Sequence, residues 1–419
     1  MFIKSFKISN KLKYILPISL ILVLLVSIYF AFFHNSSTLP TSVTPDPLHG
    51  IWQSDGNMTI ENTTIDSQTN ENKEEKKYIK WFEFNVCYDA LVKTAKLDVD
   101  SHVNGEAIQY NWIELISYLA CKYGNDFSKF KQKDLDTLVE KLKSGQTIAD
   151  LTKDLKNYSY YFEGYDAVLH EFIGEYQKEI AESTTKNVQN SQNAENVENT
   201  ENIENTQNLE NSSKGVKKPQ FETTYGLKAF HPVAKNYAYS HYDDFGNSRS
   251  YGYKRLHFGN DLMGSIGTPI VAVESGIIEA VGWNQYGGWR IGIRSFDKKR
   301  YYYYAHLRKN HPYAEGIEEG KVVTAGDVIG YLGMTGYSTK ENVNNINVPH
   351  LHFGLQLIFD EVQKEGPNQI WVDLYDLVDF LKKNRSEVFK SNPKTKDYSR
   401  KYQILDPIVP TTDYYSYNS

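Results

Sequence analysis

The spacing of apolar and polar residues divides the chain into segments of different kinds. Residues 14–33 form an almost continuous apolar run, long enough to span a bilayer as a helix. Residues 34–77 are polar, contain several prolines and show no periodicity, which predicts a flexible tether. From 78 to 182 the apolar residues recur with the helical period, and from 221 to 385 they alternate with polar residues in short runs. The chain is therefore predicted to be multidomain, with a transmembrane helix, a small all-α domain and a mainly antiparallel β domain.

The helical segment contains recognisable start and stop signals. Asn111 can cap a helix that ends at Gly124, and Thr147 followed by Asp150 has the pattern of a capping box. A last apolar stripe predicts one more helix, and its members are Val168, Leu169, Phe172, Ile173 and Tyr176. The sequence assigns no chemistry to this domain, so its role stays open, and docking of a protein partner is one option.

Residues 183–220 separate the helical segment from the β segment. Asparagine recurs there at every third position from Asn187 to Asn211, a period that fits neither helix nor strand. We interpret the segment as a disordered spacer that averages about 30–35 Å from end to end. Such a leash would let the two domains move apart.

The β segment is predicted from four glycine-broken runs, which lie at 269–281, 289–294, 300–307 and 328–333. A further strand, 350–357, alternates Leu351, Phe353, Leu355 and Leu357 with polar residues, so that His350 and His352 share the opposite face. Residues 373–383 are predicted to form a closing helix, and 386–419 a C-terminal tail.

Charge and cysteine content indicate which partners, which membrane orientation and which thiol state to expect. The 419 residues carry a net charge of -6 with no basic patch, so nucleic acid is not an expected partner. Four lysines precede the apolar run and none follows until Lys73, which predicts a cytoplasmic N-terminus, residues 1–13, and an extracellular remainder held at the cell membrane. A cleaved signal peptide is the alternative. Cys87 and Cys121 either pair or remain free buried thiols, and we favour the second option.

Candidate chemistry is concentrated in three elements of the β segment. These are His257 with Asp261, then His306 at the end of a tyrosine-rich strand, and then His350 with His352. Four histidines and an aspartate exceed the needs of a zinc site with three protein ligands. The surplus imidazoles could move protons or stabilise an oxyanion. Spacing alone does not divide these residues into ligands and catalysts.

The same motifs resemble the lysostaphin-type zinc metallopeptidases, which cut peptide cross-links and stems of bacterial peptidoglycan. The resemblance covers about a quarter of the chain, in family order, and rests on His257-x-Gly-x-Asp261, Gly267-Thr-Pro-Ile-Val-Ala-Val, Tyr304-Ala-His306, Thr335-Gly336 and His350-Leu-His352. It implies Zn²⁺ held by His257, Asp261 and His352, with His306 and His350 as catalytic residues in a β-sheet cleft. The expected function is a zinc endopeptidase, and the alternative is a scaffold or activator of other cell-wall hydrolases.

Two stretches depart from the family pattern. Residues 337–349 lengthen the connection to His350, and the segment after His306 is also extended. Both are expected to reshape the cleft wall and therefore to affect substrate preference. Three further histidines, His231, His241 and His311, are expected at the surface. The bond cut, the biological process and the oligomeric state are not predicted.

Overall fold

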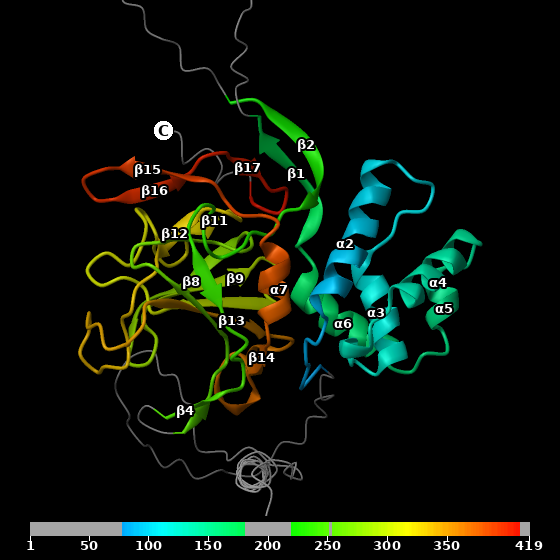
Figure 1. Ribbon diagram of the computed structural model, residues 1–419, viewed down its shortest axis with the longest axis horizontal. Coiled ribbons are helices and arrows are strands. Elements are labelled where there is room, and N and C mark those ends of the chain that lie inside the picture. Colours follow the sequence, from blue (N-terminus) through cyan, green and yellow to red (C-terminus); the bar gives the residue numbers. More distant parts are fainter. Residues whose placement is uncertain (1–77, 181–218, 251–253, 411–419) are drawn as a thin grey trace, which may run out of the picture. The chain divides into compact units, whose positions relative to one another are not determined.

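The computed structural model describes residues 78–180, 219–250 and 254–410, which all belong to the same structural unit of the chain (Figure 1). The predicted anchor at 14–33, the tether at 34–77 and most of the spacer at 183–220 lie outside the described residues. Within the described ranges, no helix is long and apolar enough to cross a membrane.

The helical segment begins as the sequence predicts. Its helices are α2 (Tyr88–Val103), α3 (Trp112–Tyr123), α4 (Gln132–Lys143), α5 (Ile148–Thr152) and α6 (Tyr158–Leu169), with a 3-10 turn at Phe127–Lys129. Asn111 caps α3 by accepting from two backbone N–H groups, and Gly124 ends the helix in the left-handed conformation. Thr147 and Asp150 form the predicted capping box of α5. Cys87 and Cys121 are free thiols, as we favoured, although both are half-buried.

The last predicted helix is wrong. Helix α6 ends at Leu169, and Ile173–Glu179 is instead strand β1. It pairs antiparallel with β2 (Phe221–Leu227) on one side and with β17 (Ile404–Leu405) on the other. Burial alternates along β1, as it does in a strand. Over so short a stretch, the same apolar residues are also compatible with the spacing of a helix, so the sequence pattern does not distinguish the two. The partners that decide between the two lie far away in the sequence.

The β1–β2 pairing also changes the interpretation of the spacer. Glu179 lies opposite Phe221, and the N–H of Ile180 donates to the carbonyl of Gln220 over 2.8 Å. The residues that flank segment 181–218 are therefore hydrogen-bonded neighbours. Between these described flanks, the expected separation of two independently moving domains is not observed.

The central sheet is antiparallel, as predicted. Its strands are β3 (Tyr239–His241), β6 (Asn260–Gly264), β8 (Gly276–Asn284), β9 (Gly288–Ser295), β10 (Arg300–Ala305), β11 (Val322–Val323), β13 (His350–Leu357) and β14 (Ile370–Val372). The order is β11-β8-β9-β10-β13-β6-β3, with β14 also paired to β13. One predicted strand, 269–281, is in fact two: β7 (Pro269–Val271) pairs with β12 (Val328–Tyr331) in a separate sheet, and only β8 joins the central one.

Smaller elements complete the unit. Two short hairpins, β4 (Ser248–Arg249) with β5 (Arg255–Leu256) and β15 (Val388–Asn392) with β16 (Asp397–Arg400), lie apart from the central sheet. Single 3-10 turns occupy Glu361–Gln363 and Gly366–Asn368, and the predicted closing helix is α7 (Tyr375–Leu381). One side of β13 is fully buried through Leu351, Leu355 and Leu357. Because side chains alternate along a strand, its polar residues face the other way.

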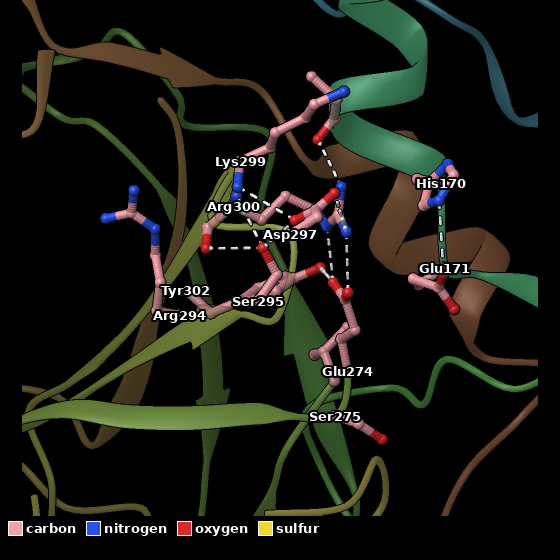
Figure 2. Close-up of polar contacts among 12 residues, drawn as sticks. His170, Glu171, Glu274, Ser275, Arg294, Ser295, Asp297, Lys299, Arg300 and Tyr302 are labelled. Carbon is pink, nitrogen blue, oxygen red and sulfur yellow. Dashed lines mark hydrogen bonds and ion pairs between the residues drawn. The ribbon is translucent and has the colours of Figure 1, made fainter. Parts of the chain in front are cut away.

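A buried ion pair joins the central sheet to the helical segment. The guanidinium of Arg300 donates to both carboxylate oxygens of Glu274, over 2.7 and 2.9 Å, and its Nη1 donates to the carbonyl of Ala167 in α6 over 3.0 Å (Figure 2). Arg300 is fully buried and Glu274 is 3% exposed. A buried charge of this kind is tolerated only when it is paired and hydrogen-bonded, so the helix carbonyl is part of its environment.

Candidate metal centre

Strand β13 places two of the predicted residues beside their partners on neighbouring strands. His352 lies directly opposite Asp261 of β6 on one side and Ala305 of β10 on the other. Directly opposed residues of an antiparallel pair have Cβ atoms about 4.5–5.5 Å apart, so this register alone brings the imidazole to the carboxylate. His306 follows Ala305, at the end of β10 next to β13.

His257 reaches the same point from the loop before β6. The chain passes so close to β13 that a Cβ added at Gly259 would lie 2.7 Å from Cε1 of His352 and 2.7 Å from the carbonyl oxygen of Phe353. Only glycine permits this approach. The glycine of the His-x-Gly-x-Asp motif therefore has a steric reason, which is to let His257 and His352 meet.

Three side chains converge as a candidate metal-binding group. Ligand atoms of His257, Asp261 and His352 all lie within 4.8 Å of one another. Nε2 of His257 is 2.8 Å from Nδ1 of His352 and 3.1 Å from Oδ1 of Asp261, and the latter two atoms are 3.3 Å apart. Two imidazole nitrogens and one carboxylate oxygen are a donor set that suits Zn²⁺ with a position left for substrate or water.

The two remaining histidines are held differently. Nδ1 of His306 lies 2.9 Å from the carbonyl oxygen of Thr335, and Nδ1 of His350 lies 2.7 Å from that of Val348. A carbonyl only accepts, so in the neutral form of each ring Nδ1 carries the proton and Nε2 presents a lone pair. Nε2 of His350 is 3.6 Å from Oδ1 of Asp261, and the rings of His306 and His350 are 4.7 Å apart. All five predicted residues thus come together.

His306 also has an unusual backbone. Its φ of 61° lies in the left-handed region, which a residue other than glycine seldom adopts. Its N–H donates to the carbonyl of Gly287 over 2.7 Å, which fixes this conformation from the neighbouring β8–β9 loop. In this conformation the imidazole of His306 does not follow the alternation of side chains along β10. It lies beside the ring of His350.

Two contributors escaped the sequence analysis, Asp244 and Arg249. The carbonyl oxygen of Asp244 lies 3.0 Å from Nδ1 of His257, and its Oδ1 accepts from the N–H of Asp261 over 3.2 Å. Nη2 of Arg249 donates to Oδ2 of Asp244 over 2.7 Å and to Oδ2 of Asp261 over 3.1 Å. Asp261 therefore has one oxygen on Arg249 and the other facing the histidines. Such partners orient metal ligands, but neither residue has a motif spacing that would have revealed it.

Burial and charge shift the protonation of the group. Burial, and then the nearby His350 and His352, hold the pKa of His306 well below its ordinary value. Burial likewise lowers the pKa of His352. Burial opposes the charged form of His257, but hydrogen bonds to Asp244 and Asp261 raise its pKa to about 9. Burial also opposes ionisation of Asp261, yet hydrogen bonds from His257 and His352 hold its pKa well below the usual range.

The two stretches that depart from the family pattern contact each other. Oδ1 of Asn342 accepts from the N–H of Asn310 and from Nε1 of Trp289, each over 2.9 Å. The first bond links the segment 337–349 to the segment after His306, and the second links it to β9.

The expected surface position is wrong for two of the three further histidines. His231 is fully buried, and the side chain of His241 is 3% exposed, because both pack against aromatic rings, those of Tyr239 and Tyr375. His311 is partly exposed and pairs with Asp397. None of the three joins the candidate metal-binding group among the described residues.

Comparison with known proteins assigns the segment that holds this group. Residues 255–364 match the model of peptidase family M23. An L-Ala--D-Glu endopeptidase of Bacillus subtilis (strain 168) is 39% identical over 124 residues, which are 30% of this chain and 36% of that protein. Lysostaphin of Staphylococcus staphylolyticus is 40% identical over 99 residues, which are 23% of this chain and 18% of that protein. The chain thus spans little more than a third of the length of the first relative and less of the second.

Among solved structures, the catalytic domain of the antimicrobial peptidase lysostaphin from Staphylococcus simulans is similar over 34% of this chain and 92% of that chain. The identity is 31% and the TM-score 0.26.

Proposed function

We propose that this chain, whose residues 255–364 are a peptidase family M23 domain homologous to lysostaphin, is a zinc-dependent endopeptidase that hydrolyses peptide bonds of bacterial peptidoglycan. The observation that carries the proposal is the convergence of His257, Asp261 and His352 within 4.8 Å beside two further imidazoles. A scaffold without activity has no need of the additional pair. We therefore favour the enzyme over the non-hydrolytic alternative.

The donor set determines which residues would hold the metal. Nε2 of His257, Oδ1 of Asp261 and Nδ1 of His352 are the facing atoms, because Nδ1 of His257 and Oδ2 of Asp261 are engaged by Asp244 and Arg249. A bound Zn²⁺ supplies a water whose pKa is lowered to about 7 and polarises the scissile carbonyl.

His306 and His350 supply the proton chemistry. Their Nδ1 atoms donate to carbonyls, so each Nε2 is unprotonated in the neutral ring and can accept the proton of the attacking water. The other ring, once protonated at Nε2, can donate a hydrogen bond to the negative charge that develops on the carbonyl oxygen. Burial holds the pKa of His306 well below its ordinary value, so this ring is neutral at pH 7.

Residues 14–33 anchor the enzyme in the cell membrane in our proposal, with residues 1–13 in the cytoplasm and the peptidase outside, where peptidoglycan lies. An anchored enzyme suits local remodelling of the wall better than a diffusing toxin. A reporter fused after Lys77 should report an outside location and stay with the membrane fraction. Recovery of a shortened, secreted protein would identify the apolar run as a cleaved signal instead.

Digestion of purified muropeptides by the full chain, with the fragments identified by mass, tests the activity and also reveals the bond. We expect hydrolysis that a chelator abolishes and zinc restores, with about one zinc bound per chain. Zinc binding without any cleavage would favour the scaffold or activator. Cleavage that is insensitive to chelation would contradict the metal-dependent mechanism.

A further inference from the structure

The two carboxylate oxygens of Asp261 lie in different environments. Oδ1 is 3.1 Å from Nε2 of His257, 3.3 Å from Nδ1 of His352 and 3.6 Å from Nε2 of His350. Oδ2 accepts a hydrogen bond from Nη2 of Arg249 over 3.1 Å. Asp261 is only 6% exposed, so this charge-assisted bond is formed largely out of water, where it is strong. The guanidinium therefore competes with a metal for one of the two oxygens.

Arg249 is held in place by the protein around it. Its Nη2 donates to Oδ2 of Asp244 over 2.7 Å and lies 3.1 Å from Nδ1 of His257. The backbone before Arg249 is tied to the ligand segment, because the N–H of Gly246 donates to the carbonyl of His257 over 2.8 Å. The N–H of His257 in turn donates to the carbonyl of Asn247 over 2.9 Å. These contacts position the guanidinium without any contribution from a metal.

The number of oxygens that Asp261 offers decides how many positions of the metal remain open. A carboxylate can bind a metal ion through one oxygen or through both. One atom from each of His257, Asp261 and His352 leaves the fourth position of a tetrahedral Zn²⁺ for substrate or water. A second oxygen from Asp261 would occupy that position or raise the coordination number to five.

We propose that Arg249 is a positioning residue that restricts Asp261 to one metal-binding oxygen and so keeps the position for the substrate open. The inference rests on the proposed function, because it concerns the zinc site of that enzyme. It also gives Arg249 a definite effect on metal affinity. A positive charge beside a ligand repels Zn²⁺, so Arg249 weakens zinc binding while it preserves the open position. Asp244, which carries a negative charge, acts on the affinity in the opposite direction.

Metal spectroscopy of the full chain tests this role without reference to activity. X-ray absorption of the zinc-loaded chain should show four ligand atoms, of which one is a carboxylate oxygen. Visible absorption of the Co²⁺-loaded chain should have the high intensity of a four-coordinate ion. Arg249→Met should reduce this intensity, because the released Oδ2 of Asp261 raises the coordination number to five. Two carboxylate oxygens on zinc in the unaltered chain, or an unchanged Co²⁺ spectrum in Arg249→Met, would overturn the proposal.

Zinc affinity and the rate of hydrolysis should change separately in Arg249→Met. We expect a Kd for zinc no higher than that of the unaltered chain, while kcat/KM for muropeptides falls by about tenfold to a hundredfold. Arg249→Lys keeps the charge but lacks the planar fork that reaches two carboxylates, so its Co²⁺ spectrum should be intermediate. A tenfold loss of zinc affinity in Arg249→Met would show that Arg249 supports the site only in a general way, and would overturn its restricting role.

Lys254 provides the matched control, because it is an exposed cation close to Arg249 in the sequence. Lys254→Met should change neither the Co²⁺ spectrum nor the rate. A spectral change as large as that of Arg249→Met would trace the effect to charge and overturn the positioning role. If Arg249→Met fails to fold, as its melting temperature would reveal, X-ray absorption of the unaltered chain still decides between one bound oxygen and two.

Failure of the proposed function is recognised separately. A chain that has the expected metal spectra but cleaves no muropeptide would contradict the endopeptidase and leave the role of Arg249 supported. A chain that cleaves muropeptides while both oxygens of Asp261 bind zinc would support the enzyme and overturn the role of Arg249.

Discussion

The backbone carbonyl of Asp244 lies 3.0 Å from Nδ1 of His257, and the carboxylate of the same aspartate accepts from the N–H of Asp261. One residue outside the ligand motif thus holds two of the three candidate ligands. Its carboxylate also places Arg249 against the second oxygen of Asp261.

Asp244→Ala keeps the backbone carbonyl beside His257 but removes the carboxylate that accepts from the N–H of Asp261 and from Arg249. It should therefore weaken zinc binding by about tenfold to a hundredfold, the usual cost of losing an orienting partner. Loss of orientation and loss of a negative charge both weaken zinc binding. The affinity is measured by competition with a chromophoric chelator, which does not depend on activity. Asp243→Ala is the control, because Asp243 is an exposed neighbour and its replacement removes the same charge without changing a contact to a ligand. Equal losses in both variants would mean that charge, and not positioning, is responsible.

The sequence alone predicts β13 well and its surroundings less well. Strict alternation of leucine and phenylalanine with polar residues places both histidines of β13 on the face opposite its buried side chains. The period of a strand is enough to establish this. The pairing of His352 with Asp261 depends on which strands are neighbours. Order along the chain does not reveal that, and only the family resemblance supplied it.

The parts that were missed share a physical reason. The carbonyls of Thr335 and Val348, which fix the protonation of His306 and His350, belong to the backbone and have no signature in residue type. Strand β1 was mistaken for a helix because its partner, β2, follows only after the asparagine-rich spacer. Local patterns determine local structure, whereas these features depend on contacts between distant segments.

Replacement of His306 or His350 by alanine should leave zinc content near one per chain and lower the rate of hydrolysis by about 10²–10⁴-fold, the usual contribution of a positioned acid–base group. Zinc is measured by mass spectrometry and hydrolysis by release of muropeptide fragments. His311→Ala is the control, since His311 pairs with Asp397 outside the candidate metal-binding group. Zinc loss in His350→Ala with retention in His352→Ala would exchange the roles of these two residues.

His231 should make the fold sensitive to acid. Burial lowers its pKa to about 3, and its Nδ1 accepts a hydrogen bond from the N–H of Val233, which a ring protonated at that nitrogen could not do. Between that pKa and the ordinary value of about 6.5, the unfolded chain binds a proton that the folded chain does not. The free energy of unfolding therefore falls as the pH falls through this window, by up to about 1.4 kcal/mol per pH unit, and the effect is absent above it.

His231→Asn keeps an acceptor for the N–H of Val233. It should reduce the slope of the unfolding free energy against pH by the equivalent of about one bound proton. Urea midpoints at pH 5 and 7.5, in the presence of a chelator, measure it. His170 provides a contrast, because its hydrogen bond to Asp166 raises its pKa, and His170→Asn should therefore lose stability on the acidic side. An unchanged slope in His231→Asn would show that this ring is protonated in the folded state.

The last prediction concerns the unity of the helical segment and the peptidase domain. Seven residue pairs join β1 to β2, from Ile173 opposite Leu227 to Glu179 opposite Phe221. Tyr225 of β2 donates to the buried carboxylate of Asp98 in α2 over 2.8 Å, and Arg300 donates to the carbonyl of Ala167. Separation would expose these groups to water and deprive the buried guanidinium of Arg300 of the carbonyl of Ala167.

A chain cut at a protease site inserted between residues 183 and 218 should therefore remain whole in the absence of denaturant. We expect the two fragments to elute together in size exclusion and to retain zinc, and to separate only in urea. Tyr225→Phe should lower the urea concentration needed, because the buried carboxylate of Asp98 loses the hydroxyl that donates to its Oδ1 and keeps the N–H of Trp112 on its Oδ2, at a cost of about 1–3 kcal/mol. Lys299→Met, which removes a half-exposed pair with Asp166, should have little effect. Fragments that separate without denaturant would instead support two independently moving domains joined by a flexible spacer. The helical segment would then be free to bind a partner of its own.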